Sequence, residues 1–176
     1  MMNRRSFLAL AAAVTLSACA APLLEEGVAQ QLKITSVSVD VSSIEGVKGR
    51  KISKLPEQVR ADIAAAVSGQ LAAGSVGTRP AKAQLSVKRV QLVSPGQSFL
   101  IGGSSTISGT LQVTDARTGE VILAPTDVVG TAKSGYALGG VIGAAVKANQ
   151  TPEDDYKATV AGFAADVRKR LLGAQK

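Results

Sequence analysis

The sequence predicts an α+β domain of order β-α-β-β-β-α, in which two helices pack on one face of an antiparallel sheet to form a two-layer sandwich. Three observations lead to this prediction: strands with alternating apolar and polar residues, two segments with apolar residues at helical spacing, and one hairpin turn. The chain has 176 residues, of which 45% are hydrophobic, so it suits a single core rather than two.

The first strand is expected over residues 33–42, where three valines alternate with polar side chains. A loop over residues 43–54 follows, and Pro56 suits the first turn of a helix. Four apolar residues then recur at every fourth position: Val59, Ile63, Val67 and Leu71. We therefore expect the first helix over residues 56–73.

A second strand is expected over residues 82–93, where the apolar phase changes after Val87. The change predicts either a bulge near Lys88 or a strand that is covered on both faces. Residues 105–114 and 121–131 are expected to pair as a hairpin, because Asp-Ala-Arg-Thr-Gly between them is a turn sequence.

The final helix is expected to begin after Thr151, whose hydroxyl can cap it, with Pro152 in its first turn. Its apolar residues form one stripe: Tyr156, Val160, Phe163, Val167 and Leu171. Acidic residues at the start of this helix and basic residues at its end complement the helix dipole.

The composition limits the chemistry that the chain can perform. There is no histidine and only one cysteine, so the commonest general base and the usual zinc ligands are missing. We expect no metal, no cofactor and no catalytic site. The formal net charge is +7, but no aromatic residues stand among the basic ones, so nucleic acid is not an expected partner.

The first residues have the layout of an export signal. Arg4 and Arg5 form a positive region, a largely apolar stretch follows, and small residues lead to Cys19. The apolar stretch, residues 7–16, is too short to cross ~30 Å of hydrocarbon as a helix.

The run Leu16-Ser17-Ala18-Cys19 closely resembles the lipobox of bacterial lipoproteins. In that family the cysteine thiol takes a diacylglycerol, the signal is cut before it, and the new N-terminus is acylated with a fatty acid such as palmitate. The resemblance implies that Cys19 is the lipidation site and that the protein is anchored in a membrane.

The same resemblance divides the chain into a cleaved signal (1–18), an acylated N-terminus with a tether (19–32) and a periplasmic domain (33–176). Ala20 follows the cysteine where Asp would favour the inner membrane, so the periplasmic side of the outer membrane is expected, with the inner membrane as the alternative. Arg4-Arg5-Ser6-Phe7-Leu8 also resembles the twin-arginine motif, so export by the general or the twin-arginine route is open.

A second resemblance covers residues 105–172. The strand and turn from Gly109 to Glu120, a glycine-rich segment and a C-terminal amphipathic helix are similar to several uncharacterised small envelope lipoproteins of Gram-negative bacteria. This resemblance implies an accessory, non-enzymatic domain and carries over no functional residue.

Two apolar segments, residues 94–104 and 134–148, are the candidates for partner binding, because exposed apolar stretches mark contacts. The candidate residues are Phe99, Leu100, Ile101, Tyr136, Leu138, Val141 and Ile142. The glycine-rich 134–148 segment could equally be a loop over the sheet edge or a short docked helix.

Four basic residues lie close together in the loop before the first helix: Lys48, Arg50, Lys51 and Lys54. They are candidates for contact with anionic headgroups or other acidic envelope polymers. The alternative is a solvated loop whose charge serves only solubility.

Together these features predict a lipid-anchored periplasmic accessory protein that binds another envelope component, with an envelope protein as the expected partner. One alternative is an enzyme acting on cell-wall glycan or peptide through Asp115, Glu120 and Asp127. Another is a carrier of apolar ligands with a cavity between helices and sheet. That cavity would be lined by Val67, Leu71, Phe163 and Val167.

Overall fold

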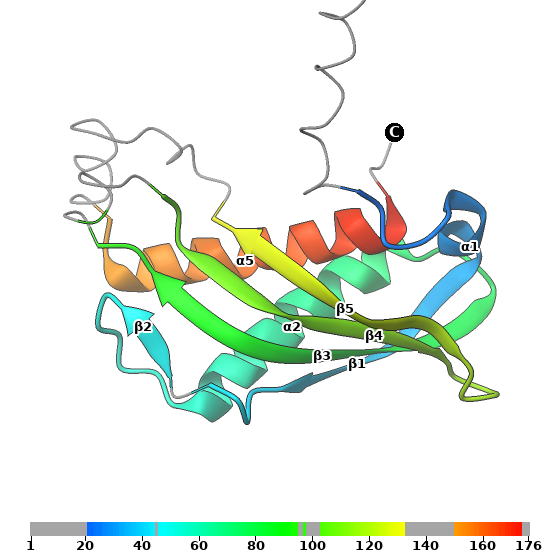
Figure 1. The fold of residues 1–176 in the computed structure, drawn as a ribbon, viewed down its shortest axis with the longest axis horizontal. Helices are drawn as coiled ribbons and strands as arrows, with labels where there is room; N and C mark the ends of the chain where they lie inside the picture. Colours follow the sequence, from blue (N-terminus) through cyan, green and yellow to red (C-terminus); the bar gives the residue numbers. More distant parts are fainter. Residues whose placement is uncertain (1–20, 45, 95–96, 98–102, 133–149, 174–176) are drawn as a thin grey trace, which may run out of the picture.

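The computed structural model of the chain describes residues 21–44, 46–94, 97, 103–132 and 150–173. A sheet forms one layer, and helices α2 and α5 cover one of its faces (Figure 1). The elements are α1 (Glu26–Gln31), β1 (Leu32–Asp40), β2 (Val47–Gly49), α2 (Pro56–Gly74), β3 (Arg79–Leu92), β4 (Thr106–Asp115), β5 (Val121–Thr131) and α5 (Pro152–Leu172). The predicted two-layer α+β architecture is confirmed.

The sheet has the strand order β1-β3-β4-β5, and the short strand β2 also pairs with β3. Strands β3, β4 and β5 are antiparallel neighbours, and the predicted hairpin of β4 with β5 is confirmed. Strands β1 and β2 run parallel to β3, so the sheet is mixed and the expectation of a purely antiparallel sheet is corrected. The reason is the crossover through α2, which returns the chain to the end of the sheet where β1 began.

A bulge in β3 explains the change of apolar phase that the sequence contains. The pairing of β3 with β4 shifts between Val87 and Arg89, so the bulge near Lys88 is confirmed. Because of this extra residue, Val90 and Leu92 are buried on the same face as Leu85. A similar shift lies in β1 between residues 34 and 36.

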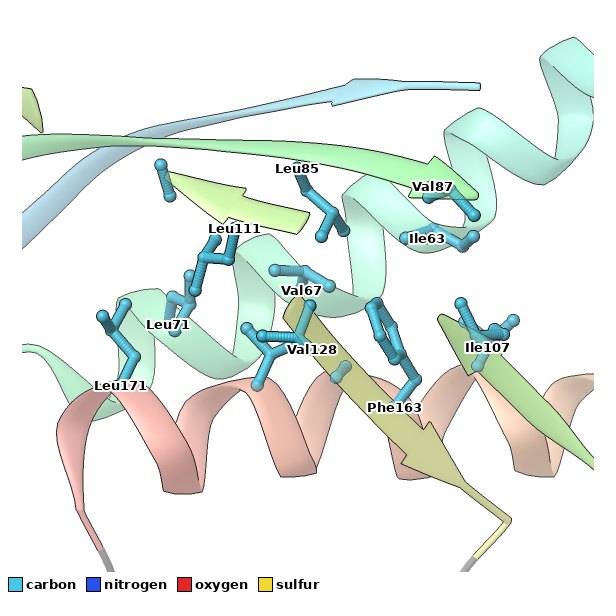
Figure 2. Packing of buried hydrophobic residues seen from close by; sticks show 14 of the residues in the cluster. Ile63, Val67, Leu71, Leu85, Val87, Ile107, Leu111, Val128, Phe163 and Leu171 are labelled. Carbon is cyan, nitrogen blue, oxygen red and sulfur yellow. The ribbon is translucent and has the colours of Figure 1, made fainter. Parts of the chain in front are cut away.

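The core lies between the sheet and the two helices. All four predicted core residues of α2 and the whole apolar stripe of α5 are buried. Figure 2 shows Phe163 of α5 in the same layer as Val67 of α2 and Ile107 of β4. Full burial of one such side chain contributes about 1.5–3 kcal/mol, so this layer holds the fold together.

Two glycines allow α5 to lie unusually close to β5. A Cβ atom on Gly162 would stand 2.8 Å from the carbonyl carbon of Thr131, and one on Gly130 would overlap the backbone of Phe163. Side chains of α5 also reach the open edge of β5. The N–H of Thr131 donates to Asp166 (3.3 Å), and Arg170 donates to the carbonyl of Asp127 (3.0 Å). This edge is therefore partly blocked against pairing with another strand.

Part of the segment expected as a tether, residues 19–32, lies against the domain. The backbone N–H of Leu23 donates to the carbonyl oxygen of Arg170 (2.7 Å), and α1 follows with Ala29 buried against the domain. A six-residue helix has little stability of its own, so its sequence offers only a weak signal. In the folded domain, α1 contacts α5. None of the helices within the described residues combines the length and apolarity needed to span a membrane.

Candidate functional site

The domain has two distinct ends (Figure 1). The proximal end consists of α1, the C-terminal end of α5 and the β4–β5 turn, and the segment from residue 21 enters there. The distal end consists of β2, the start of β4 and the start of α5. Both segments expected to bind a partner leave and rejoin the described structure at the distal end, because β3 and β5 end there and β4 and α5 begin there.

A buried group of polar side chains lies at the distal end, and we call Arg50, Ser105 and Asp155 the polar clasp. The Ser105 hydroxyl donates to Asp155 Oδ2 (2.7 Å), and both residues are 0% exposed. One guanidinium nitrogen of Arg50 lies 4.0 Å from the same carboxylate oxygen, with the Arg50 side chain 12% exposed. The other donates to the carbonyl oxygen of Gln150 (2.6 Å).

Backbone hydrogen bonds connect the clasp to the elements around it. The N–H of Arg50 donates to the carbonyl of Leu92 (3.2 Å), which extends the pairing of β2 with β3. The hydroxyl of Ser105 accepts from the N–H of Val93 (3.0 Å), and its carbonyl accepts from Ala132 (3.3 Å). The clasp therefore joins the residues on both sides of the 94–104 segment to those on both sides of the 134–148 segment.

The start of α5 sets the position of Asp155. The Thr151 hydroxyl accepts from the N–H of Asp154 (3.1 Å), which confirms the predicted cap. With the helix start set in this way, Asp155 lies at the edge of the buried stripe, one residue before Tyr156. Thr159, one turn further on, donates to the carbonyl of Asp155 (2.6 Å).

The chemistry of the clasp is structural rather than nucleophilic. A serine acts as a nucleophile only when a base removes its proton and a substrate can approach it. Ser105 is inaccessible to solvent, and its proton points to a carboxylate with no histidine between them. Buried polar groups that bond to one another hold the surrounding backbone in a unique position. The clasp can thus position the bases of the two apolar segments.

The carboxylates of the hairpin lie around Arg79. Its Nε is 2.8 Å from Asp115 Oδ2, and its Nη2 is 3.1 Å from Glu120 Oε2. Asp115 Oδ1 also accepts from the N–H groups of Arg117 and Thr118 (2.9 and 3.2 Å). The hydrogen bond from Arg79 and these two backbone bonds lower the pKa of Asp115 to about 2. Asp115 is therefore an ionised turn residue and cannot serve as a proton donor near neutral pH.

Asp127 lies apart from the other two carboxylates. It is paired with Lys88 (2.7 Å) and stands opposite Thr110, whereas Asp115 is five residues further along β4. Five residues of strand span about 17 Å, which exceeds the ~5–9.5 Å between the two carboxylates of a glycosidase. The three residues are not brought together in one cleft.

The four basic residues of the predicted anion-binding loop are distributed over different surroundings. Arg50 belongs to the clasp, whereas Lys48 and Lys51 are exposed. Lys54 is paired with Asp62 (2.8 Å) and stands 5.0 Å from the centre of the Tyr156 ring. The structure therefore does not present them as one patch of four cations.

Tyr156 closes this part of the α2–α5 contact. Its hydroxyl donates to Asp62 (3.1 Å), and burial, followed by the charge of Asp62, raises the pKa of the phenol. The phenol stays neutral and cannot act as a base. The four residues of the alternative ligand cavity are buried side chains of the core, and Figure 2 shows Val67, Leu71 and Phe163 filling that layer.

Several predicted residues lie outside the described residues. These are Cys19 with the signal, and the seven apolar candidates for partner binding: Phe99, Leu100, Ile101, Tyr136, Leu138, Val141 and Ile142. Within the described part of the chain, no three residues of the types His, Cys, Asp and Glu come together as metal ligands.

Sequence reasoning did not identify Ser105 and Asp155 as partners, because 50 residues separate them. One signal was available. Asp155 and Thr159 are spaced by one helical turn beside Tyr156 and Val160, which places a carboxylate on the buried side of α5. A buried carboxylate requires hydrogen-bonding partners, so this spacing alone indicates a polar contact in the core.

No family model matches the chain, and no curated protein matches it in sequence. Among solved structures, one match is a candidate lipoprotein of Caulobacter crescentus CB15, with 15% identity, coverage of 81% of this chain and 88% of that one, and a TM-score of 0.35. A protein of Xanthomonas campestris described by the family model DUF330 has 11% identity, 81% coverage of both chains and a TM-score of 0.39.

A PelC dodecamer of Paraburkholderia phytofirmans has 10% identity, coverage of 85% of this chain and 91% of that one, and a TM-score of 0.35. At such low identities and TM-scores, none of these similarities transfers an activity or a residue role to this chain.

Proposed function

We propose that the protein is a lipid-anchored accessory protein of the bacterial envelope that acts by binding another envelope component, not by catalysis. The observation that carries this proposal is the run Leu16-Ser17-Ala18-Cys19 after a positive and then an apolar segment. Two acyl-bearing attachments at one N-terminus suffice for stable anchoring in a membrane. We place the anchor on the periplasmic side of the outer membrane, after export by the general or the twin-arginine route.

The arrangement of the domain supports binding at the distal end. The polar clasp joins the bases of the 94–104 and 134–148 segments, which hold the apolar candidates Phe99–Ile101 and Tyr136–Ile142. An apolar segment on a rigid base binds with a smaller loss of conformational entropy. The 134–148 segment is thus the part of the chain that we propose for contact with an envelope protein.

The enzyme alternative receives less support. It requires carboxylates that converge on a substrate, whereas Asp115 and Glu120 pair with Arg79 and Asp127 pairs with Lys88. The carrier alternative requires a cavity where the core side chains Val67 and Phe163 are packed.

In-cell photo-crosslinking tests the proposal. A photoreactive amino acid replaces Leu138 in the 134–148 segment, and the control places it at Val76, an apolar residue of the proximal end that is 89% exposed. We expect a protein adduct from position 138 that mass spectrometry identifies and that is lost in Cys19→Ala. Adducts from position 76 alone, or from neither position, contradict binding through this segment.

A further inference from the structure

We propose that the proximal end of the domain lies directly against the bilayer that holds the Cys19 lipid, with a hollow beside α1 facing the lipid headgroups. This inference rests on the proposed lipid anchor and adds to it the surface that meets the membrane. It also determines which end of the domain points into the periplasm.

The length of chain between the lipid and the domain carries the inference. Only Ala20, Ala21 and Pro22 separate Cys19 from Leu23. Four residue steps span at most about 14 Å even when the chain is fully extended. The N–H of Leu23 is already bonded to the carbonyl of Arg170, so no further slack exists while α1 is docked.

The proximal end offers a surface that suits the boundary of a bilayer. A hollow of about 510 Å³ opens there between the N-terminal segment and the end of α5. Pro22, Leu24, Ala29 and Leu172 give it an apolar part, and Glu26 and Gln30 give it a polar part. The hollow begins three residues after the lipid attachment point, so the anchor places lipid beside it.

Charge does not supply the attraction. Among the exposed charged residues of the proximal end, Glu25, Glu26 and Glu120 offset Lys33, Arg117 and Lys169. The short connection to Cys19 therefore determines the orientation, and we expect it to persist in vesicles without anionic lipid.

The other end of the domain lies well away from the membrane in this orientation. Strand β3 has 14 residues and α5 has 21, and both run between the two ends. At 3.3 Å and 1.5 Å per residue these lengths are about 46 and 32 Å. Ser43 is exposed and follows β1, which begins at the proximal end and whose nine residues span about 30 Å, so we expect it roughly 30 Å from the bilayer surface.

Fluorescence quenching compares how close positions 30 and 43 lie to the lipid headgroups. The full-length product is purified from membranes with its lipid and reconstituted into phosphatidylethanolamine–phosphatidylglycerol vesicles. Because lipidation consumes the thiol of Cys19, a cysteine introduced by Gln30→Cys or Ser43→Cys is the only reactive thiol for a bimane label. Lipids with a spin label in the headgroup then quench the bimane. We expect strong quenching at position 30 and little at position 43.

A second variant tests whether the short connection to Cys19 determines this orientation. Twelve Gly and Ser residues inserted between Ala21 and Pro22 should lower the quenching at position 30 towards that at position 43. Equal quenching at both positions, stronger quenching at position 43, or no effect of the insertion overturns the proposed orientation.

Mass spectrometry of the same samples separates the two proposals. If Cys19 carries no lipid, the anchor and the orientation both fail. If the lipid is present and the two positions are quenched equally, only the orientation fails and the proposed binding at the distal end is unaffected.

Discussion

Replacing Gly162 by alanine should destabilise the domain, although alanine favours a helix by about 1 kcal/mol over glycine. The new Cβ would lie 2.8 Å from the carbonyl carbon of Thr131, and the oxygen of that carbonyl is closer still. Since carbon atoms in contact are about 3.5–4.0 Å apart, α5 and β5 must separate by at least about 0.7 Å. Overpacking of this kind costs about 1–3 kcal/mol, so the expected net loss is up to about 2 kcal/mol after the helix gain.

Gly69 provides the matched control, because it is an exposed interior residue of α2 whose Cβ would meet nothing within 4 Å. Gly69→Ala should therefore stabilise the protein by about 0.5–1 kcal/mol. Thermal unfolding followed by far-ultraviolet circular dichroism measures both effects. At about 2–4 °C per kcal/mol, we expect the midpoint to fall by up to about 8 °C for Gly162→Ala and to rise by about 1–4 °C for Gly69→Ala. A midpoint for Gly162→Ala at or above that of the parent would refute the close approach of α5 to β5.

Three further predictions concern the clasp, the hairpin and the last helix. Arg50→Met removes a charged hydrogen bond to Gln150 and a cation near Asp155. Urea unfolding should therefore show a free energy of unfolding that is lower by about 1.5–3 kcal/mol. The control Lys51→Met, at an exposed position, should change the free energy of unfolding by less than about 0.5 kcal/mol. Because the pKa of Asp115 is about 2, below its unfolded value, its ionised form stabilises the fold above about pH 5, and this contribution is lost as the pH falls towards 2. The stability difference between the parent and Asp115→Asn should therefore shrink on acidification, and a constant difference from pH 6 to 2.5 would contradict this assignment. Thr151→Ala removes the cap of α5 and should cost about 1 kcal/mol, whereas an unchanged urea midpoint would mean that the cap contributes nothing.

Local patterns were sufficient for most of the elements. Helix α2 and strand β5 were predicted within about one residue of their observed bounds, because a period of 3.6 or 2 is present wherever one face is buried. The bulge near Lys88 was also foreseeable, since one extra residue moves every following side chain to the other face of the strand. The turn at Asp-Ala-Arg-Thr-Gly was correctly expected, and the carboxylate of Asp115 accepts two backbone N–H groups within it.

Other features depend on parts of the chain that are far apart in sequence. The parallel pairing of β1 with β3 follows from the path of α2 across the sheet, which the alternation in either strand does not encode. Arg50 of the clasp bonds Gln150, 100 residues later, which the sequence did not show, so all four basic residues of the loop were predicted as one candidate group for contact with anionic surfaces. The docking of α1 likewise depends on the carbonyl of Arg170 at the other end of the chain.

The sequence by itself determined the kind of domain and predicted lipidation at Cys19, because both depend on short-range patterns. These patterns are the hydrophobic periodicity, the turn residues, and the succession of charge, apolar length and small residues before the cysteine. Only the tertiary structure decided where the ends of the domain lie, which charges are buried, and how little free chain remains between Cys19 and Leu23. The physical reason is that burial and hydrogen bonding between distant segments depend on the packing of the whole chain. The local propensity of a segment does not encode these interactions.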